Sequence, residues 1–313
     1  MHAMRVLYLA EIVGKAGIHC VKQGLKPLAK EHQVDVVIAN GDAVTGGFGL
    51  GRNHAGYLRK LGIDLITGGD QIFFKKDMAE GIAETSYVLR PANLSKHAPG
   101  RGWRHFTLSG SRKSAEQAPD GNAADPEAAQ SGDASAPTDR PEPAPVKLAV
   151  LSLLGQSGFE RMHASNPYVY LENMAERVVK DSKALIIDFH ALTTAEKYTM
   201  FHFADGLATA VIGSGQRVQT ADAQVMPKGT AVICDAGRTG SQDSVGGLAP
   251  EQEIRRFTHR VPVRSAEAWA RLELQGVLIE IDEASGYVTK FESLRHPVQA
   301  PSQSESNESQ TVS

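Results

Sequence analysis

Acidic and imidazole side chains recur in this sequence directly after its apolar runs. Glu11, Asp42 and Asp70 follow successive early runs, and His190 follows a later one. Neighbouring carboxylates repel one another unless a hard cation, a guanidinium or protonation balances their charge. Carboxylate oxygens together with one imidazole are suited to Mg, Mn or Fe(II). These residues are therefore candidate ligands for a divalent cation, and Arg217 is the alternative counter-charge.

Short apolar runs that alternate with amphipathic stretches must position these side chains. This alternation is typical of βαβ units with a buried, largely parallel sheet. Ligands bind beyond the carboxyl ends of the strands in such sheets, which is where the acids lie. A single acid at a strand end can equally cap a helix or accept turn hydrogen bonds, so only the joint pattern favours a site. The predicted strands are 5–9, 34–39, 64–67, 147–153, 183–188, 208–212 and 230–234, the predicted helices are 18–31 and 54–61, and 272–281 with 287–293 is a predicted hairpin.

Two segments have a composition that cannot build a core. Residues 110–145 are rich in Pro, Ala, Ser and acids, and residues 299–313 are mostly Ser, Gln and Glu. We predict a disordered insertion and a disordered tail for them. The α/β pattern resumes directly after the insertion, so we expect one domain over 4–298 that the insertion interrupts.

Composition excludes several classes of protein. The chain has 313 residues, 41% of them apolar and 22% charged, which excludes disorder throughout. No apolar run is long enough for a membrane helix, and no secretory signal pattern is seen, so we expect a cytoplasmic protein without a membrane partner. Cys20 and Cys234 are too few for a disulfide framework. The net charge of -3 excludes a polybasic nucleic-acid binder but leaves a local basic site open.

Several blocks of the sequence, in the same order, resemble the YmdB-like branch of the calcineurin-like metallophosphoesterases. The blocks are 4–15, 37–42, 64–71, 188–191 with 196–197, 218–222, and 234–240 with 243–245. The resemblance implies an α/β/β/α sandwich. In typical members it also implies a two-metal phosphodiesterase that acts on cyclic nucleotides. Since family members commonly self-associate, we expect a homo-oligomer.

The sequence departs from the family pattern at residues that carry the chemistry. Gln71 stands at the family's proton-donor position, and an amide cannot deliver a proton to a leaving group. Gly215 and Arg217 stand where the family has metal-binding histidines. A guanidinium has no lone pair for a cation and would repel one at close range. We therefore expect the first metal of the family's pair to be absent.

The second metal position keeps more of its ligands. Asp42, Asp70 and His190 remain, with Glu11 as a further candidate, so we expect either no metal or one weakly held Mn, Mg or Fe ion. Arg217 would then bind an anion or compensate the charge of the acids.

Two functions follow from these departures. The first is a degenerate, noncatalytic member that binds a protein partner or a phosphate-containing small molecule. The alternative is an active metal-dependent cyclic nucleotide phosphodiesterase with an altered one-metal centre. Contact of Arg217 with Glu11 or Asp42 would favour the first, and an Arg217 side chain in an open pocket would favour the second. We expect the first.

Overall fold

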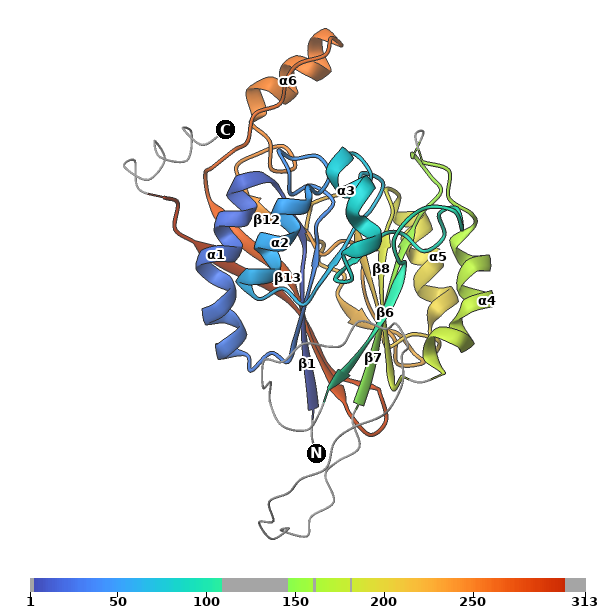
Figure 1. Ribbon diagram of the computed structural model, residues 1–313. Coiled ribbons are helices and arrows are strands. Elements are labelled where there is room, and N and C mark those ends of the chain that lie inside the picture. The colour runs from blue at the N-terminus through green and yellow to red at the C-terminus, as the bar shows by residue number, and fades with distance from the viewer. Residues whose placement is uncertain (1–2, 109–145, 160–161, 181, 302–313) are drawn as a thin grey trace, which may run out of the picture.

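Two β-sheets packed face to face form the centre of the computed structural model, and helices cover both outer faces (Figure 1). The structure describes residues 3–108, 146–159, 162–180 and 182–301. The predicted insertion and most of the predicted tail lie outside these residues. The predicted α/β/β/α sandwich is confirmed, and its layers place the strand ends of both sheets along one edge.

The first sheet contains the strands that carry the early acids. Its central strands run parallel, except that β13 lies antiparallel between β1 and β12. The sheet is therefore mixed, where the sequence predicted a largely parallel one. Its order is β2 (Glu11–Ile12), β12 (Arg238–Ser241), β13 (Leu272–Asp282), β1 (Ala3–Leu9), β3 (Val36–Asn40), β4 (Leu65–Thr67) and β5 (Val88–Leu89), with β14 (Val288–Val298) paired to β13.

The second sheet carries the candidate histidine. Strands β7, β8, β9 and β11 are parallel, and an antiparallel strand closes each edge. Strands β6 and β7 flank the predicted insertion and pair with each other along their length. The order is β10 (Gln224–Val225), β11 (Ala231–Ile233), β9 (Ala210–Ser214), β8 (Ala184–His190), β7 (Val146–Leu154) and β6 (Trp103–Leu108).

Alternation along the strands sorts their side chains between the layers. Val6 and Tyr8 of β1 face the core between the two sheets, whereas Leu7 and Leu9 face the helices. This is the period of two that strand geometry imposes. The outer face of the first sheet is covered by α1 (Gly14–Glu31), α2 (Arg52–Leu61) and α3 (Lys76–Gly81). Helix α3 continues into a short 3-10 turn (Ile82–Glu84). The outer face of the second sheet is covered by α4 (Pro167–Val179) and α5 (Thr194–Ala204).

Helix ends are fixed by local and distant caps. Asn166 accepts hydrogen bonds from the first turn of α4, where Pro167 is the first helical residue. Glu267, far along the chain, accepts a hydrogen bond of 2.8 Å from the backbone N–H of Lys15 at the start of α1. Such a carboxylate also complements the positive end of the helix dipole. The loop before β13 is thereby tied to the segment that follows Glu11.

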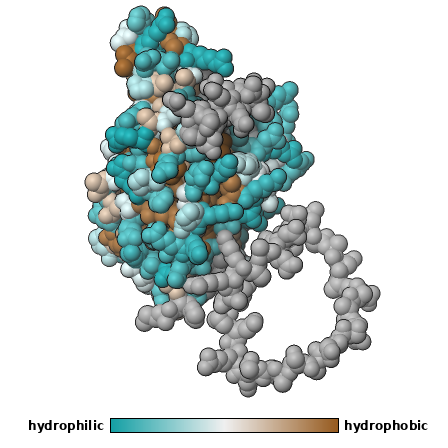
Figure 2. All heavy atoms as spheres, turned by 90° about the vertical axis from the view of Figure 1, so that its left-hand side faces the viewer, coloured by the Kyte–Doolittle hydropathy of each residue, from teal (hydrophilic) through white to brown (hydrophobic). Residues whose placement is uncertain are grey.

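One helix stands apart from the sandwich. Helix α6 (Pro250–His259) projects from the body, and apolar side chains lie among polar ones on this projection in Figure 2. Ile254 and Phe257 are among its exposed apolar residues. In the described part of the chain, none of the helices has the length and apolarity needed to span a membrane.

Candidate functional site

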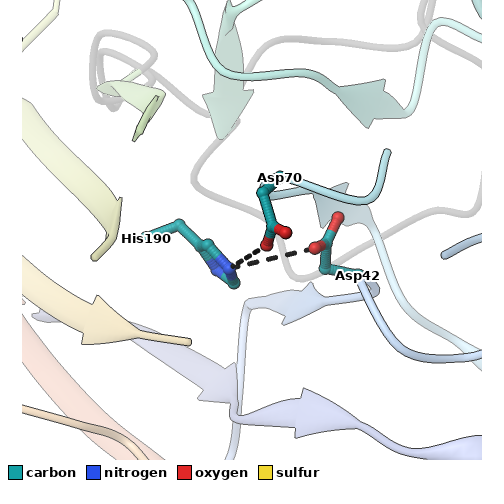
Figure 3. A group of neighbouring side chains, drawn as sticks. All are labelled: Asp42, Asp70 and His190. Carbon is teal, nitrogen blue, oxygen red and sulfur yellow. Dashed lines mark hydrogen bonds and ion pairs between the residues drawn. The ribbon is translucent and has the colours of Figure 1, made fainter. Parts of the chain in front are cut away.

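The carboxyl ends of strands from both sheets meet at one place. Asp42 follows β3 and Asp70 follows β4 in the first sheet, whereas His190 is the last residue of β8 in the second. The three side chains point toward one another across the junction of the sheets (Figure 3). One ligand atom from each lies within 4.8 Å of the others. The sandwich thus brings together three of the four predicted metal ligands.

His190 lies between the two carboxylates. Its Nε2 atom is 3.1 Å from Oδ1 of Asp70 and 3.8 Å from Oδ2 of Asp42. Asp42 and His190 are buried, and Asp70 is partly exposed toward the open side of the cluster. An oxygen, nitrogen and oxygen donor set of this kind is suited to a divalent cation of intermediate hardness.

Burial and mutual charge shift the ionisation of the cluster. Burial raises the pKa of Asp42 to about 7, and the charges of Asp70 and Glu11 act in the same direction. Burial alone would lower the pKa of His190, but its hydrogen bond to Asp70 and the charges of Asp42 and Glu11 raise that pKa to about 9. Without a cation, the imidazolium therefore balances the carboxylates. A divalent ion would take over that role.

The backbone after β4 holds Asp42 in place. Gly69 donates its N–H to Oδ1 of Asp42 at 2.6 Å, and Gln71 donates its N–H to Oδ2 at 2.9 Å. A Cβ atom on Gly69 would lie 2.4 Å from the ring of His190. Only glycine allows this loop to pass so close to the imidazole, because real side chains do not tolerate such an approach.

Glu11 does not join the metal-ligand cluster but pairs with Arg217. Oε1 of Glu11 accepts a hydrogen bond of 2.9 Å from Nε of Arg217, and Nη2 of the same guanidinium lies 2.9 Å from that oxygen as an ion pair. Oε2 of Glu11 is buried and has no hydrogen-bond partner among the described residues. Of the two acids that Arg217 could contact, it pairs with Glu11, whereas Asp42 accepts hydrogen bonds from the backbone N–H groups of Gly69 and Gln71.

Arg217 is held in an uncommon backbone conformation. Its φ is 58°, in the left-handed region that few non-glycine residues adopt. The guanidinium of Arg238 donates a hydrogen bond of 2.6 Å to the carbonyl of Arg217 and others to Ser241 and Gln242. Arg238 therefore supports the loop that presents Arg217.

A pocket of about 360 Å³ opens over the cluster. Polar side chains line it together with the apolar side chains of Phe159, Met162 and Leu192. The ring of Phe159 stacks on His190 with 5.8 Å between ring centroids and 27° between planes. The sequence carried no motif for these apolar residues, because a single aromatic residue in a loop has no local signature. The lining residues are Glu11, Asp70, Gln71, Gly158, Phe159, Met162, His190, Leu192, Gly215 and Arg217.

Comparison with known proteins identifies the family. A family model described as YmdB-like protein matches residues 7–116 and 130–294. The chain belongs to the YmdB-like family. The resemblance predicted from the sequence blocks is thereby confirmed.

Two relatives of this YmdB-like chain match it over nearly its whole length. A Bacillus subtilis (strain 168) protein named 2',3'-cyclic-nucleotide 2'-phosphodiesterase is 30% identical over 289 residues, which is 92% of this chain and 96% of the relative. A Mycoplasma genitalium protein named putative phosphatase/phosphodiesterase is 30% identical over 300 residues, or 94% of each chain.

Solved structures with the same fold are also known. A Mycoplasma pneumoniae crystal structure described as a novel phosphatase is 28% identical, with a TM-score of 0.79 over 96% of each chain. A hypothetical protein from Thermus thermophilus is 24% identical, with a TM-score of 0.76 over 95% of this chain and 100% of the other, and shows the shared fold alone.

The expectation of a noncatalytic binding or scaffold protein is wrong. The relatives named phosphodiesterase or phosphatase cover almost the whole YmdB-like chain, and Asp42, Asp70 and His190 form a cluster that could hold a metal ion. The Arg217–Glu11 contact that was expected to favour a scaffold does form, but the same guanidinium lines the pocket. That contact is therefore compatible with catalysis. The expected cytoplasmic location and homo-oligomer remain predictions.

Proposed function

We propose that this YmdB-like protein is a metal-dependent phosphodiesterase that hydrolyses a cyclic nucleotide at a one-metal centre. The observation that carries the proposal is the convergence of Asp42, Asp70 and His190 within 4.8 Å, where Asp70 and His190 line the same pocket as Arg217. The names of the relatives, phosphodiesterase and phosphatase, support the same reaction class.

The residues present fit one divalent cation. Asp42 and Asp70 would supply oxygen ligands and His190 would supply Nε2, a combination that Mn, Mg or Fe(II) accepts. Glu11 lines the same pocket and adds negative charge there, and its buried Oε2 has no hydrogen-bond partner within the described part of the chain. A bound ion would polarise the phosphoryl group of the substrate. Arg217 occupies the place of a second ion in the charge balance.

Arg217 is suited to bind the phosphate. Its guanidinium is held by one hydrogen bond and one ion-pair contact to Oε1 of Glu11 and by a longer hydrogen bond to the carbonyl of Gly246, while it still lines the pocket. A guanidinium that is already held in place loses little entropy when it binds an anion, and its hydrogen bonds to phosphate are charge-assisted. Arg217 would therefore orient the substrate and neutralise charge on the phosphoryl oxygens.

Gln71 sets an upper limit on the rate. Its side chain lines the pocket, and an amide can hydrogen-bond to the substrate without transferring a proton. General acid catalysis contributes about 10² to 10⁴ in rate. We propose that this protein turns over more slowly, by about that factor, than a family member with histidine at this position.

The apolar side chains of the pocket favour a nucleotide over a small phosphate ester. Phe159, Met162 and Leu192 line the same pocket as Arg217, and its volume of about 360 Å³ is typical of small-ligand sites. Aromatic and apolar side chains bind the flat face of a base by stacking and burial of apolar surface.

The experiment is hydrolysis of a 2',3'-cyclic nucleotide by purified protein supplied with Mn²⁺. We expect turnover by the native chain, and a loss of at least about 100-fold in Asp70→Asn because the cation loses a charged ligand. Asp282→Asn is the matched control, since Asp282 is the last residue of β13 and is not among the residues that line the pocket. An inactive native chain, or an Asp70→Asn variant as active as the control, would overturn the proposal.

A further inference from the structure

A buried polar network lies behind His190, on the side away from the two acidic ligands. Nδ1 of His190 is 3.0 Å from Oγ of Ser214, the last residue of β9. That hydroxyl is 2.7 Å from Oδ1 of Asp188, which lies two residues before His190 in β8 and faces the space between the sheets. Asp188, Ser214 and His190 are all buried.

Counting donors and acceptors places the hydrogens of Ser214 and His190 in this network, beginning with Asn40. Asp42 donates its backbone N–H to Oδ1 of Asn40 at 3.0 Å, so the carbonyl end of that amide is identified. The amide nitrogen of Asn40 then donates to Oδ2 of Asp188 at 3.1 Å and to Oγ of Ser214 at 3.2 Å. Oδ2 of Asp188 also accepts the hydroxyl of Thr67.

The direction of the serine hydroxyl determines which nitrogen of the imidazole carries a hydrogen. An ionised carboxylate only accepts hydrogen bonds, so the single proton of Ser214 Oγ must point to Asp188. Ser214 therefore accepts from Asn40 and also from His190. It follows that Nδ1 of His190 carries a hydrogen. When the ring is neutral, the free lone pair is on Nε2, which faces Asp70 and Asp42.

We infer that Asp188 and Ser214 are positioning residues that hold the neutral ring of His190 as the Nδ1–H tautomer, with Nε2 ready to bind a cation. Neither residue touches the pocket in the described structure, and both act through the imidazole. The link to metal binding rests on the proposed function. The tautomer itself does not, because hydrogen bonds between protein groups alone determine it.

Asp188→Asn tests the inference without changing the size of the side chain. Asn40 and Thr67 both donate to Oδ2, so an amide at position 188 would turn its oxygen to them and its NH₂ group to Ser214. The serine proton would then point to Nδ1 of His190, and the ring hydrogen would move to Nε2. A carboxylate-to-amide change of this kind imposes the wrong histidine tautomer in serine proteases.

Two serine variants separate hydrogen bonding from packing. Ser214→Ala removes the acceptor of Nδ1, whereas Ser214→Thr keeps the hydroxyl on a residue that suits a strand. Asp205→Asn is the matched control for the amide substitution. Asp205 accepts hydrogen bonds from the backbone N–H groups of Lys228 and Thr230 and does not contact His190 in the described structure. Should Asp188→Asn fail to fold, judged by its thermal unfolding, the serine pair carries the test.

Two measurements are made on these proteins. The first is Mn²⁺ affinity, which we expect to weaken about 10- to 100-fold in Asp188→Asn and Ser214→Ala and to stay at the native value in Ser214→Thr and Asp205→Asn. The second is a long-range ¹H–¹⁵N spectrum of His190 in metal-free protein at alkaline pH. It should show Nδ1–H in the native chain and Nε2–H in Asp188→Asn.

The outcomes separate this inference from the proposed function. An Nε2–H ring in the native chain, or unchanged Mn²⁺ affinity in both Asp188→Asn and Ser214→Ala, would overturn the positioning role. An Nδ1–H ring in a native chain that binds no Mn²⁺ would instead overturn the metal centre and leave the tautomer assignment standing.

Discussion

Removing the guanidinium of Arg217 should destabilise the fold by an amount set by the burial of its partner. Glu11 has 1% of its side chain exposed and Arg217 has 14%. In Arg217→Met, Oε1 of Glu11 loses its 2.9 Å hydrogen bond from Nε and its 2.9 Å ion-pair contact with Nη2, and Oε2 has no hydrogen-bond partner to begin with among the described residues. Breaking a buried ion pair from one side costs about 3–5 kcal/mol, because an uncompensated charge remains buried.

Replacing Glu11 with an uncharged residue should restore most of the free energy of unfolding that Arg217→Met loses. We expect Arg217→Met to lower the free energy of unfolding in urea by about 3 kcal/mol, the low end of that range, since the pocket admits water to the pair. Glu11→Gln/Arg217→Met should recover about 2 kcal/mol of this loss. Arg271→Met is the control, because its partner Asp243 is half exposed and such pairs contribute at most about 1 kcal/mol.

The reasoning would be refuted by either of two results. If Arg217→Met is within about 1 kcal/mol of the native protein, the Glu11–Arg217 pair is not a buried charge balance. If the double variant is no more stable than Arg217→Met, the loss comes from packing of the arginine side chain rather than from the stranded carboxylate.

Three further predictions concern the site. Gly69→Ala should abolish Mn²⁺ binding measured by calorimetry, because its Cβ would lie 2.4 Å from the His190 ring, whereas Gly56→Ala in α2 should leave binding at the native value. Phe159→Ala should raise KM for a cyclic nucleotide about tenfold, the equivalent of one lost base stack, without changing the rate on a phosphodiester that lacks a base. The raised pKa of His190, about 9, means that metal binding must displace a proton at neutral pH, so Mn²⁺ affinity should rise about tenfold per pH unit from pH ~7 to ~9. For the same reason, the stability that the His190 pKa shift gives the metal-free protein is full below its unfolded pKa of about 6.5 and is lost as the pH rises through about 9.

The early strands and the site acids were predictable because their signals are local. An apolar run that ends in a polar residue predicts both a buried strand and the place where its side chains converge, which is how Asp42, Asp70 and His190 were found. Pairing between distant segments has no such signal. The antiparallel position of β13 beside β1 joins residues far apart in the chain and made the sheet mixed.

Other features became visible only in three dimensions. Strand β6 was missed because its sequence interleaves Arg104 and His105 with aromatic residues and lacks an apolar run. Phe159 comes from a loop without a motif, and it reaches the site only because β7 and β8 are neighbours. The sequence predicts Glu11 near the site. Its pairing with Arg217 instead of the metal-ligand cluster depends on distances between side chains, which a sequence pattern does not contain.

Metal content measured together with turnover tests the central claim most directly. The native chain, purified and equilibrated with Mn²⁺, is analysed for bound metal while its hydrolysis of a 2',3'-cyclic nucleotide is followed. The one-metal centre predicts one ion per chain at Asp42, Asp70 and His190 and turnover that a chelator abolishes. Two tightly bound ions per chain, or turnover that persists in metal-free protein, would contradict it.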